Sequence, residues 1–405
     1  ISLKEISEFF WSIEEKYNLI DFKIDKFYVW QMARFHIFSK ILVELGLTKK
    51  RKNKKNIPFI DILSYLLHSI ISSPFLISKK SEIIIFEHKR KLLHNGEWID
   101  IYTKFFEEDL DFKKYTFITK RDNHKLYNEN KKKYLLDLFV LISNFYSLLR
   151  SKKLNKKDKN FINNIENEIK SNIKINIDLE NFLSKYYLLY KALFTLYSLF
   201  IKIKNIRKIF LVVNYDYYAP LIHVAKLNNI PVYEIQHGSI KKFHMGYSYP
   251  NTKKNELICF PDFIITYDWE TIDCEILPID KSKVIYKDYK RISYKKNVND
   301  YIKKKKICVI SQNTVGNAIS QIILDNIDRL KDYTIYYKLH PEEIDIFSEY
   351  KAISSLQNYK NFILYKEKST SIYRLLNKSS IVIGVYSTAL FEAYELGCKV
   401  LVLNL

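Results

Sequence analysis

The sequence has little glycine, proline or cysteine: among 405 residues there are 7 Gly, 8 Pro and 4 Cys. So few Gly and Pro exclude a collagen-like or low-complexity chain. The cysteines are far apart and form neither a CxxC pair nor a His/Cys group at zinc-ligand spacing, so we expect buried free thiols in a reducing compartment. They are Cys259, Cys274, Cys308 and Cys398. The first residues contain no apolar core of signal-peptide type, and we expect no secretory leader.

Acidic residues are outnumbered by basic ones: there are 45 Asp and Glu against 66 Lys and Arg, which gives a formal net charge of +21. Hydrophobic residues make up 47% and aromatic residues 15% of the chain, which excludes a disordered protein. A chain of this length is too long to fold around a single hydrophobic core, so two or three domains are expected. The cations gather at the ends of predicted helices and are not interleaved with Gly and aromatics as in RNA-reading motifs, which disfavours a nucleic-acid partner.

Long uninterrupted hydrophobic runs are also missing. Residues 57–78 approach the length of a spanning helix, but Asp61, His68 and Pro74 interrupt them. Residues 49–55 read KKRKNKK, and a second apolar helix pattern within 131–157 also has basic flanks. Basic runs beside amphipathic segments are typical of contact with an anionic membrane surface. The alternative is a solvated loop leading into a buried helix.

The pattern along the chain predicts an α/β protein with two Rossmann-like domains facing a cleft. Residues 1–80 are expected to form an N-terminal helical region. Residues 81–300 contain short β-branched strands and form the first Rossmann-like domain, with a helical insertion at about 120–206. Residues 301–405 alternate strand and helix regularly and form the second. Because a strand ends the chain at Leu405, we expect this second domain to continue beyond it.

Three segments of the second domain carry candidate donor-binding residues where a predicted strand ends. Lys338 and His340 precede Pro341, which holds His340 out of helical geometry. Two strands later, Ser387 or Thr388 begins a helix whose N-terminus favours an anion such as phosphate. The loop after the first predicted strand of this domain adds the candidates Asn313, Thr314 and Gly316. A structural turn histidine and a plain helix N-cap are the alternatives.

The motif KLHP, followed about 45 residues later by VYSTALFEAYELGCKVLVL, resembles GT-B glycosyltransferases of bacterial capsule and lipopolysaccharide synthesis, of the sialyltransferase, polysialyltransferase and Kdo-transferase types. The resemblance covers roughly residues 300–405. It implies that His340 contacts the donor phosphate and assists the leaving group, that Ser387 and Thr388 bind phosphate, and that Glu392 reaches the ribose. It also implies a nucleotide-sugar donor, with a CMP-sugar preferred slightly over UDP- and GDP-sugars, and a site in the cytoplasm at the inner face of the membrane.

The acceptor side has several candidate general bases. His237 lies in Gln236-His237-Gly238, which resembles the HG turn of these enzymes and of the CDP-glycerol phosphotransferases of teichoic acid synthesis. Asp216 follows a different predicted strand, and Glu87 and Asp100 lie near the end of the first. An inverting transferase needs one such imidazole or carboxylate at the acceptor hydroxyl, and the sequence does not choose among them.

A metal ion and a resident cofactor are not expected. The DxD string Asp109 to Asp111 lies in a charged helical stretch and not after a strand, and Lys338 can neutralise the leaving nucleotide. The sequence therefore indicates a metal-independent, inverting glycosyltransferase with an anionic or lipid-linked glycan as acceptor. Transfer of a polyol phosphate from a CDP donor is one alternative, and a non-catalytic basic binding protein is another.

Overall fold

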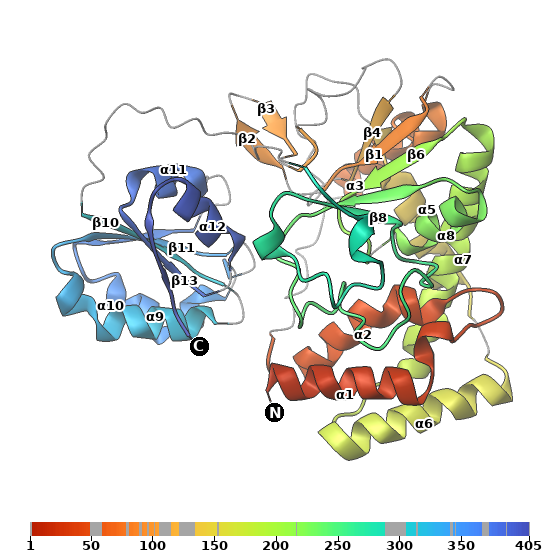
Figure 1. Ribbon diagram of the computed structural model, residues 1–405, viewed down its shortest axis with the longest axis horizontal. Helices are drawn as coiled ribbons and strands as arrows, with labels where there is room; N and C mark the ends of the chain where they lie inside the picture. The colour runs from red at the N-terminus through yellow and green to blue at the C-terminus, as the bar shows by residue number, and fades with distance from the viewer. Residues whose placement is uncertain are drawn as a thin grey trace. The chain divides into compact units, whose positions relative to one another are not determined.

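A computed structural model of the chain describes residues 2–48, 59–77, 81–88, 91–94, 97–100, 102–104, 115–120, 134–151, 154–215, 217–287, 305–312, 315–340, 343–344, 346–366, 372–385 and 387–404 (Figure 1). The chain divides into two compact units, each of which contains a parallel sheet. The first comprises Ile1–Leu45, Lys55–Lys91 and Gly96–Arg291, and the second Gly46–Lys54, Leu92–Asn95 and Ile292–Leu405. The expected cleft between two domains stays a prediction.

The first unit is built on a seven-stranded sheet in the order β5-β4-β1-β6-β7-β8-β9. All of its strand pairs are parallel. The strands are β1 (Ile83–Phe86), β4 (Tyr115–Thr119), β5 (Tyr134–Leu135), β6 (Lys208–Leu211), β7 (Val232–Ile235), β8 (Phe263–Thr266) and β9 (Val284–Tyr286). A separate pair joins β2 (Leu92–His94) and β3 (Glu97–Ile99). The inner strands are almost continuously apolar because a parallel strand is buried on both faces.

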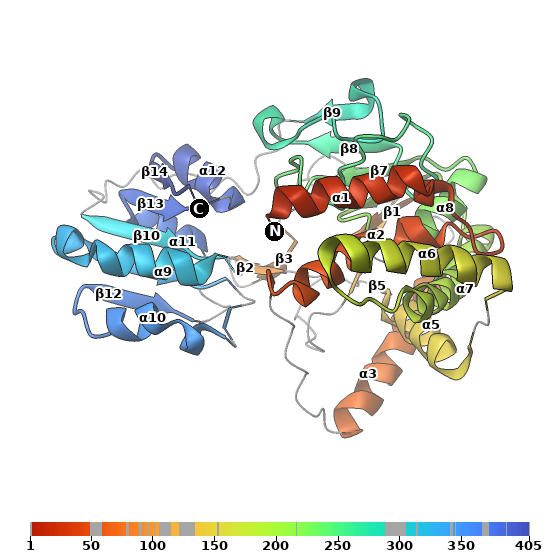
Figure 2. The same ribbon diagram turned by 90° about the horizontal axis from the view of Figure 1, so that it is seen from below.

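Helices pack against this sheet as an aromatic-rich layer. They are α1 (Leu3–Lys16), α2 (Val29–Glu44), α3 (Phe59–Ile71), α5 (Asp137–Leu149), α6 (Lys156–Ile173), α7 (Leu179–Ile203) and α8 (Ala219–Leu227). The longest, α7, packs against α2, α5 and α8, as Figure 2 shows. The predicted helical segment at about 120–206 therefore contributes to the main core of this unit.

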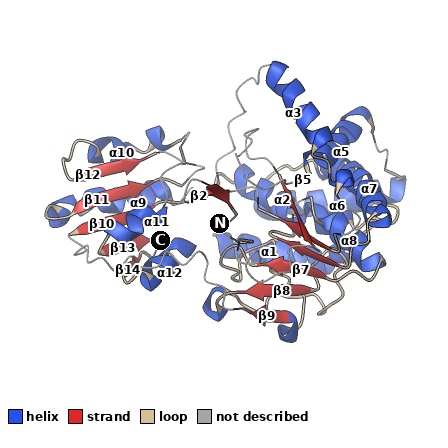
Figure 3. Ribbon diagram, turned by 90° about the horizontal axis from the view of Figure 1, so that it is seen from above, coloured by secondary structure: helices blue, strands red, loops and turns tan. Residues whose placement is uncertain are grey.

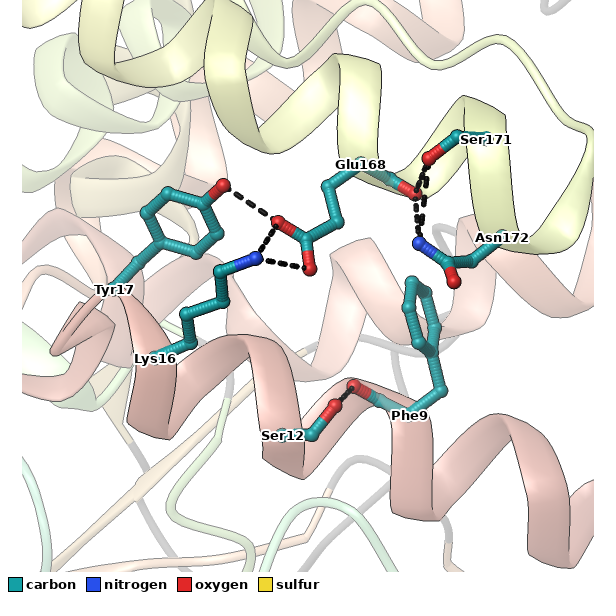
Figure 4. Close-up of polar contacts among 7 residues, drawn as sticks. All are labelled: Phe9, Ser12, Lys16, Tyr17, Glu168, Ser171 and Asn172. Atoms are coloured by element: carbon teal, nitrogen blue, oxygen red, sulfur yellow. Dashed lines mark hydrogen bonds and ion pairs between the residues drawn. The ribbon is translucent and has the colours of Figure 1, made fainter.

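A polar contact on the surface joins two helices that are far apart in the sequence. Lys16, at the end of α1, donates from Nζ to both carboxylate oxygens of Glu168 on α6, at 2.8 and 2.7 Å. The Tyr17 hydroxyl donates to the same carboxylate at 2.6 Å (Figure 4). This contact links α6 to the end of α1.

A buried ion pair ties the N-terminal helices to a loop beyond β7. Arg34 of α2 is only 1% exposed and donates from Nε to Glu14 of α1 at 2.7 Å. The same guanidinium donates to the carbonyl oxygens of Met245 and Ser248. These bonds hold the backbone on both sides of Tyr247, which becomes important below. A buried charge is tolerated here because every donor has a partner.

The second unit contains a five-stranded parallel sheet in the order β12-β11-β10-β13-β14, which is Rossmann strand order. Its elements are β10 (Lys306–Ile310), α9 (Gly316–Asp325), β11 (Thr334–Lys338), α10 (Lys351–Leu356), β12 (Phe362–Tyr365), α11 (Ile372–Lys378), β13 (Ile381–Gly384), α12 (Thr388–Glu395) and β14 (Lys399–Val402). Figure 3 shows the strands of both units by colour. The α/β fold class is confirmed, with two Rossmann-like units in one chain.

Secondary structure differs from expectation after β11. The sequence pattern predicts a helix over 342–350, whereas the structure has a short 3-10 turn at Phe347–Glu349 and then α10. Tyr350 has an extended backbone between them, at φ −85° and ψ 99°. Among the described residues, no helix is long and apolar enough to cross a membrane.

Candidate functional site

Each sheet has one point where the strand order reverses. In the first unit it lies between β1 and β6, and in the second between β10 and β13. In open parallel sheets, ligands bind at such a point, outside the carboxyl ends of the strands. The residues that follow these strands are therefore the first place to look for a site.

At the reversal point of the first sheet, histidine and tyrosine rings gather. His88 follows β1, Tyr215 follows β6 and His237 follows β7. The His88 and His237 rings are stacked with centroids 6.1 Å apart, and Tyr102 lies edge-on to both, at 5.6 and 6.3 Å. The structure thus brings together two histidines that are 149 positions apart in the sequence, and one of them is the predicted base candidate His237.

A hydrogen-bonded series leads from a buried carboxylate to His237. Asn214 donates from Nδ2 to Glu234 of β7 at 2.5 Å, and the Tyr247 hydroxyl donates to the other carboxylate oxygen. The same hydroxyl oxygen lies 3.2 Å from Nδ1 of His237. A tyrosine hydroxyl has one proton, and the carboxylate takes it, so the oxygen is left to accept from the imidazole. With Glu234 ionised, this bond is formed by the neutral tautomer of His237 that has its proton on Nδ1 and its lone pair on Nε2.

Burial makes this carboxylate unusual. Glu234 is fully buried, and desolvation raises its pKa to about 7, although the bonds from Tyr247 and Asn214 act in the opposite direction. The His244 ring lies beside Tyr247, with centroids 4.8 Å apart, and desolvation lowers its pKa to about 4. Its buried Nδ1 has no hydrogen-bond partner among the described residues. Perturbed titratable groups of this kind are typical of functional sites.

The backbone conformation and the packing near His237 are also unusual. Val213, directly after β6, has φ 73°, a left-handed conformation that is strained for a β-branched residue. Gly246 lies against the Tyr215 ring, where an added Cβ would come within 2.4 Å of Cδ1. By contrast, a Cβ at Gly238 would meet no atom of the described residues within 4 Å. There is thus open space beside the backbone next to His237.

Two other base candidates, Glu87 and Asp100, are buried in polar contacts. Lys91 donates from Nζ to Glu87 at 2.5 Å. The two oxygens of Asp100 accept from the backbone N–H groups of His88, at 2.6 Å, and Tyr102, at 2.8 Å. Desolvation raises the pKa of Asp100 to about 6, since the nearby Lys91 offsets it only in part. Asp100 therefore orders the loop that presents His88. The fourth candidate, Asp216, lies outside the described residues.

In the second unit, a buried carboxylate organises the loop after β11. Glu343 is fully buried and accepts from the Ser311 hydroxyl at 2.8 Å and from the backbone N–H of His340 at 2.7 Å. Burial raises the pKa of Glu343. Since Ser311 follows β10 and His340 follows β11, this one side chain connects the carboxyl ends of two neighbouring strands. Lys338, the last residue of β11, is only 9% exposed.

Gly316 has a packing role at the start of α9. A Cβ there would lie 1.7 Å from Oε1 of Glu343 and 2.8 Å from Oγ of Ser311. Tyr337 donates to the Gly316 carbonyl oxygen at 3.1 Å. The absence of a side chain is therefore what lets Glu343 reach Ser311. The neighbouring candidates Asn313 and Thr314 lie outside the described residues.

Ser387 is the N-cap of α12, and its hydroxyl accepts from the backbone N–H of Ala389 at 3.3 Å. Thr388 is the first residue of this helix, and the partly exposed Glu392 lies one turn further on. In the strand register, Ile310 of β10 is opposite Lys338, and Val309 is opposite Ile383. Lys338 and Gly384 are therefore at the same level on either side of β10, and the loops carrying His340 and Ser387 leave the same edge of the sheet.

The sequence did not predict several of the residues that organise these two groups of side chains. Glu234 and Tyr247 in the first unit and Glu343 in the second were not predicted. Glu234 offered one usable signal, because an acid inside a buried strand needs a specific partner. Nothing in the pattern distinguished Tyr247 from 31 other tyrosines. Among the described residues, no group of His, Cys, Asp and Glu could hold a metal ion, and Asp109 and Asp111 lie outside them.

No protein-family model matches the chain, and no curated protein matches its sequence. Solved structures resemble it. The UDP-GlcNAc 2-epimerase of Neisseria meningitidis bound to UDP-GlcNAc has a TM-score of 0.47 and 12% identity, over 80% of this chain and 82% of that chain. The S. aureus MnaA–UDP co-structure has a TM-score of 0.45 and 14% identity, over 80% and 79%. The wall teichoic acid polymerase TagF has a TM-score of 0.41 and 13% identity, over 84% and 77%. Similarity this low leaves catalysis and substrate to be argued from this chain's own residues.

Proposed function

We propose that the chain is a metal-independent glycosyltransferase of the GT-B type, which moves a sugar from a nucleotide-sugar donor to a growing capsule or lipopolysaccharide glycan. The observation that carries this proposal is the series from Glu234 through Tyr247 to His237. It holds an imidazole in the tautomer of a general base at the reversal point of a Rossmann-like sheet. Glu87 and Asp100 are engaged in buried contacts, which makes His237 the preferred base.

In the proposed reaction, Nε2 of His237 takes the proton from an acceptor hydroxyl. The oxygen attacks the anomeric carbon, the bond from that carbon to the nucleotide phosphate breaks, and the nucleotide leaves with the electron pair. General-base assistance of this kind contributes about 10²- to 10⁴-fold to a rate. The acceptor is proposed to be an anionic or lipid-linked glycan, in keeping with the net charge of +21.

Donor binding is assigned to the carboxyl edge of the five-stranded sheet. Lys338 and His340 supply positive charge or hydrogen-bond donors for the departing phosphate, and the N-terminus of α12 at Ser387 and Thr388 favours an anion. Glu392 is proposed to contact the ribose. Gly316, at the start of α9, and Asn313 and Thr314, which follow β10 in the sequence, complete the proposed donor-binding set. A CMP-sugar is the first donor to test, followed by UDP- and GDP-sugars.

The test is a thermal-shift series with CMP, CDP, UDP and GDP. A ligand that binds only the folded protein raises its stability by mass action, by about 2.7 kcal/mol at a hundred times the dissociation constant. We expect one nucleotide to raise the unfolding midpoint and Ser387→Ala to reduce that rise. The matched control is Ser380→Ala, because Ser380 precedes β13 at the opposite end of the same strand and donates to the Lys306 carbonyl oxygen. If no nucleotide shifts the midpoint, the proposal is wrong.

A second experiment measures how fast the protein consumes the donor whose nucleotide binds. We expect His237→Ala to abolish transfer while the nucleotide still shifts the midpoint. Consumption of CDP-glycerol without consumption of any sugar nucleotide would instead identify a polyol-phosphate transferase. Nucleic-acid binding that falls steeply with salt and survives His340→Ala with Ser387→Ala would identify a basic binding protein.

A further inference from the structure

Large apolar side chains are exposed on three helices of the first unit. On α5, Phe145 is 62% and Leu148 is 79% exposed, and the adjacent Leu149 is also exposed. On α3, the exposed residues follow helical spacing, and they are Leu66, Leu67, Ile70 and Ile71. On α7, Leu199 and Ile203 are exposed one turn apart. Helices α5 and α7 therefore bury one face in the protein and leave apolar side chains outside, and α3 exposes apolar side chains as well.

The three helices that carry these residues are adjacent. The hydroxyl of Tyr65 on α3 donates to the carboxylate of Asp137, in the first turn of α5, at 2.6 Å. Phe139 of α5 packs edge-on against Phe200 of α7, with ring centroids 6.1 Å apart. Figures 2 and 3 both show α3, α5 and α7 adjacent on one side of the first unit. We call the exposed apolar residues of α3, α5 and the C-terminal end of α7 the apolar face.

Basic residues lie at the C-terminal ends of two of these helices. Arg150, directly after α5, and Lys202, near the end of α7, are exposed cations. The acidic residues of the three helices are Asp61 on α3, Asp137 on α5 and Glu180 on α7, and each lies in the first turn, before the exposed apolar residues. Asp137 is only 2% exposed and bonded to Tyr65. In the sequence, the KKRKNKK stretch at 49–55 ends four positions before α3 begins. The described surface thus combines a wide apolar area with a cationic rim.

We propose that the apolar face docks on a lipid bilayer that has anionic headgroups. Leu, Ile and Phe side chains enter the boundary between headgroups and acyl chains, and the cations lie at the level of the phosphates. A second copy of this chain is a poorer occupant, because it would bring Arg150 and Lys202 against the same cations of its partner. The proposal does not depend on the chemistry of the candidate site. It would place the protein where a lipid-linked acceptor is found.

Vesicle co-sedimentation of the full chain tests this proposal without any donor or acceptor. We expect binding to vesicles with about one third phosphatidylglycerol, weaker binding to phosphatidylcholine alone, and a loss of binding to the anionic vesicles at high salt. The double variant Phe145→Glu with Leu148→Glu should bind at least about tenfold more weakly, because it removes two inserted side chains and adds two anions. Both residues are exposed, so the fold should be unaffected.

The matched control is Leu227→Glu, since Leu227 is 61% exposed at the end of α8 in the same unit but is not part of the apolar face. It should bind vesicles like the unsubstituted protein. Equal binding by the double variant, or equal loss with Leu227→Glu, would overturn the proposal. So would a dimer in vesicle-free solution that the double variant dissociates, because the apolar face would then be a contact between copies.

Discussion

The Tyr247 hydroxyl oxygen lies 3.2 Å from Nδ1 of His237, and the same hydroxyl donates a hydrogen bond to the buried Glu234. Two bonds from Arg34 to the neighbouring carbonyl groups of Met245 and Ser248 keep the tyrosine in place. An ion pair near the N-terminus therefore helps to orient an imidazole at the carboxyl end of β7. The following predictions test this arrangement and the matching one in the second unit.

Tyr247→Phe should lower kcat by roughly ten- to a thousandfold, a large part of what a general base contributes, because the His237 proton loses the acceptor that keeps it on Nδ1. KM for the donor should stay unchanged. The loss of one donor to a buried carboxylate should also reduce the free energy of unfolding by about 1–3 kcal/mol. Tyr249→Phe is the control, since Tyr249 packs on Arg34 and not on His237. A change in KM alone would contradict the assigned tautomer.

Glu234→Gln should change the pH dependence of stability. The pKa of Glu234 is about 7 in the folded protein against an ordinary 4.5, so between these values the folded state holds a proton that the unfolded state has lost. The free energy of unfolding therefore falls as pH rises through this range, by roughly 3 kcal/mol. Urea titrations should show this slope and its reduction in the variant. Asp100, whose pKa is about 6, accounts for a remaining slope at lower pH.

Glu343→Ala should loosen the proposed donor edge. The Ser311 hydroxyl and the His340 backbone N–H would both lose their acceptor in a buried position, and the free energy of unfolding should fall by roughly 2 kcal/mol or more. The nucleotide-induced thermal shift should fall as well, because His340 is no longer anchored. Glu349→Ala removes the same charge from an exposed position nearby and should change stability by no more than about 0.5 kcal/mol. Equal effects of the two variants would contradict the anchoring role.

Two glycine substitutions should behave differently. Gly316→Ala places a Cβ 1.7 Å from Oε1 of Glu343, in a position where that carboxylate is buried and bonded, so Glu343 or the start of α9 must move. Overpacking of this kind reduces the free energy of unfolding by about 1–3 kcal/mol. Gly238→Ala adds a methyl group where no atom of the described residues lies within 4 Å and should leave stability nearly unchanged. Chemical unfolding measures both, and an equal loss would show that Gly316 does not face Glu343.

Glu168→Gln should have a small effect that disappears in acid. Bonds from Lys16 and Tyr17 lower the pKa of Glu168, so its contribution is present above the ordinary 4.5 and is lost as pH falls through the lowered value. Lys16 is 60% exposed, and solvent screens the pair. Urea unfolding at neutral and at acid pH should show a slight loss only at neutral pH. Glu256→Gln, in an exposed pair with Lys253, is the control.

Much of the fold followed from short-range patterns. The β-branched runs at 82–86 and 306–311 became β1 and β10, and the regular alternation after residue 305 became a five-stranded parallel sheet. The prediction of a helix over 342–350 was wrong: the described residues there form turns and a 3-10 turn at Phe347–Glu349, and α10 begins only at Lys351, after the extended Tyr350. The spacing of apolar residues does not reveal such a break between helical segments, because this spacing is the same on both sides of the break.

What the sequence by itself determined was the α/β class, the order of the strands along the chain, and the positions of His237, His340 and Ser387 at strand ends. These depend on local spacing of apolar residues and on turn residues, which each segment carries within itself. Only the tertiary structure decided that Tyr247 joins Glu234 to His237, that Glu343 joins Ser311 to His340, and that α3, α5 and α7 form one apolar face. Such contacts depend on which side chains meet when the chain folds. A buried polar group needs a hydrogen-bond partner, but the sequence does not show which distant residue will be that partner.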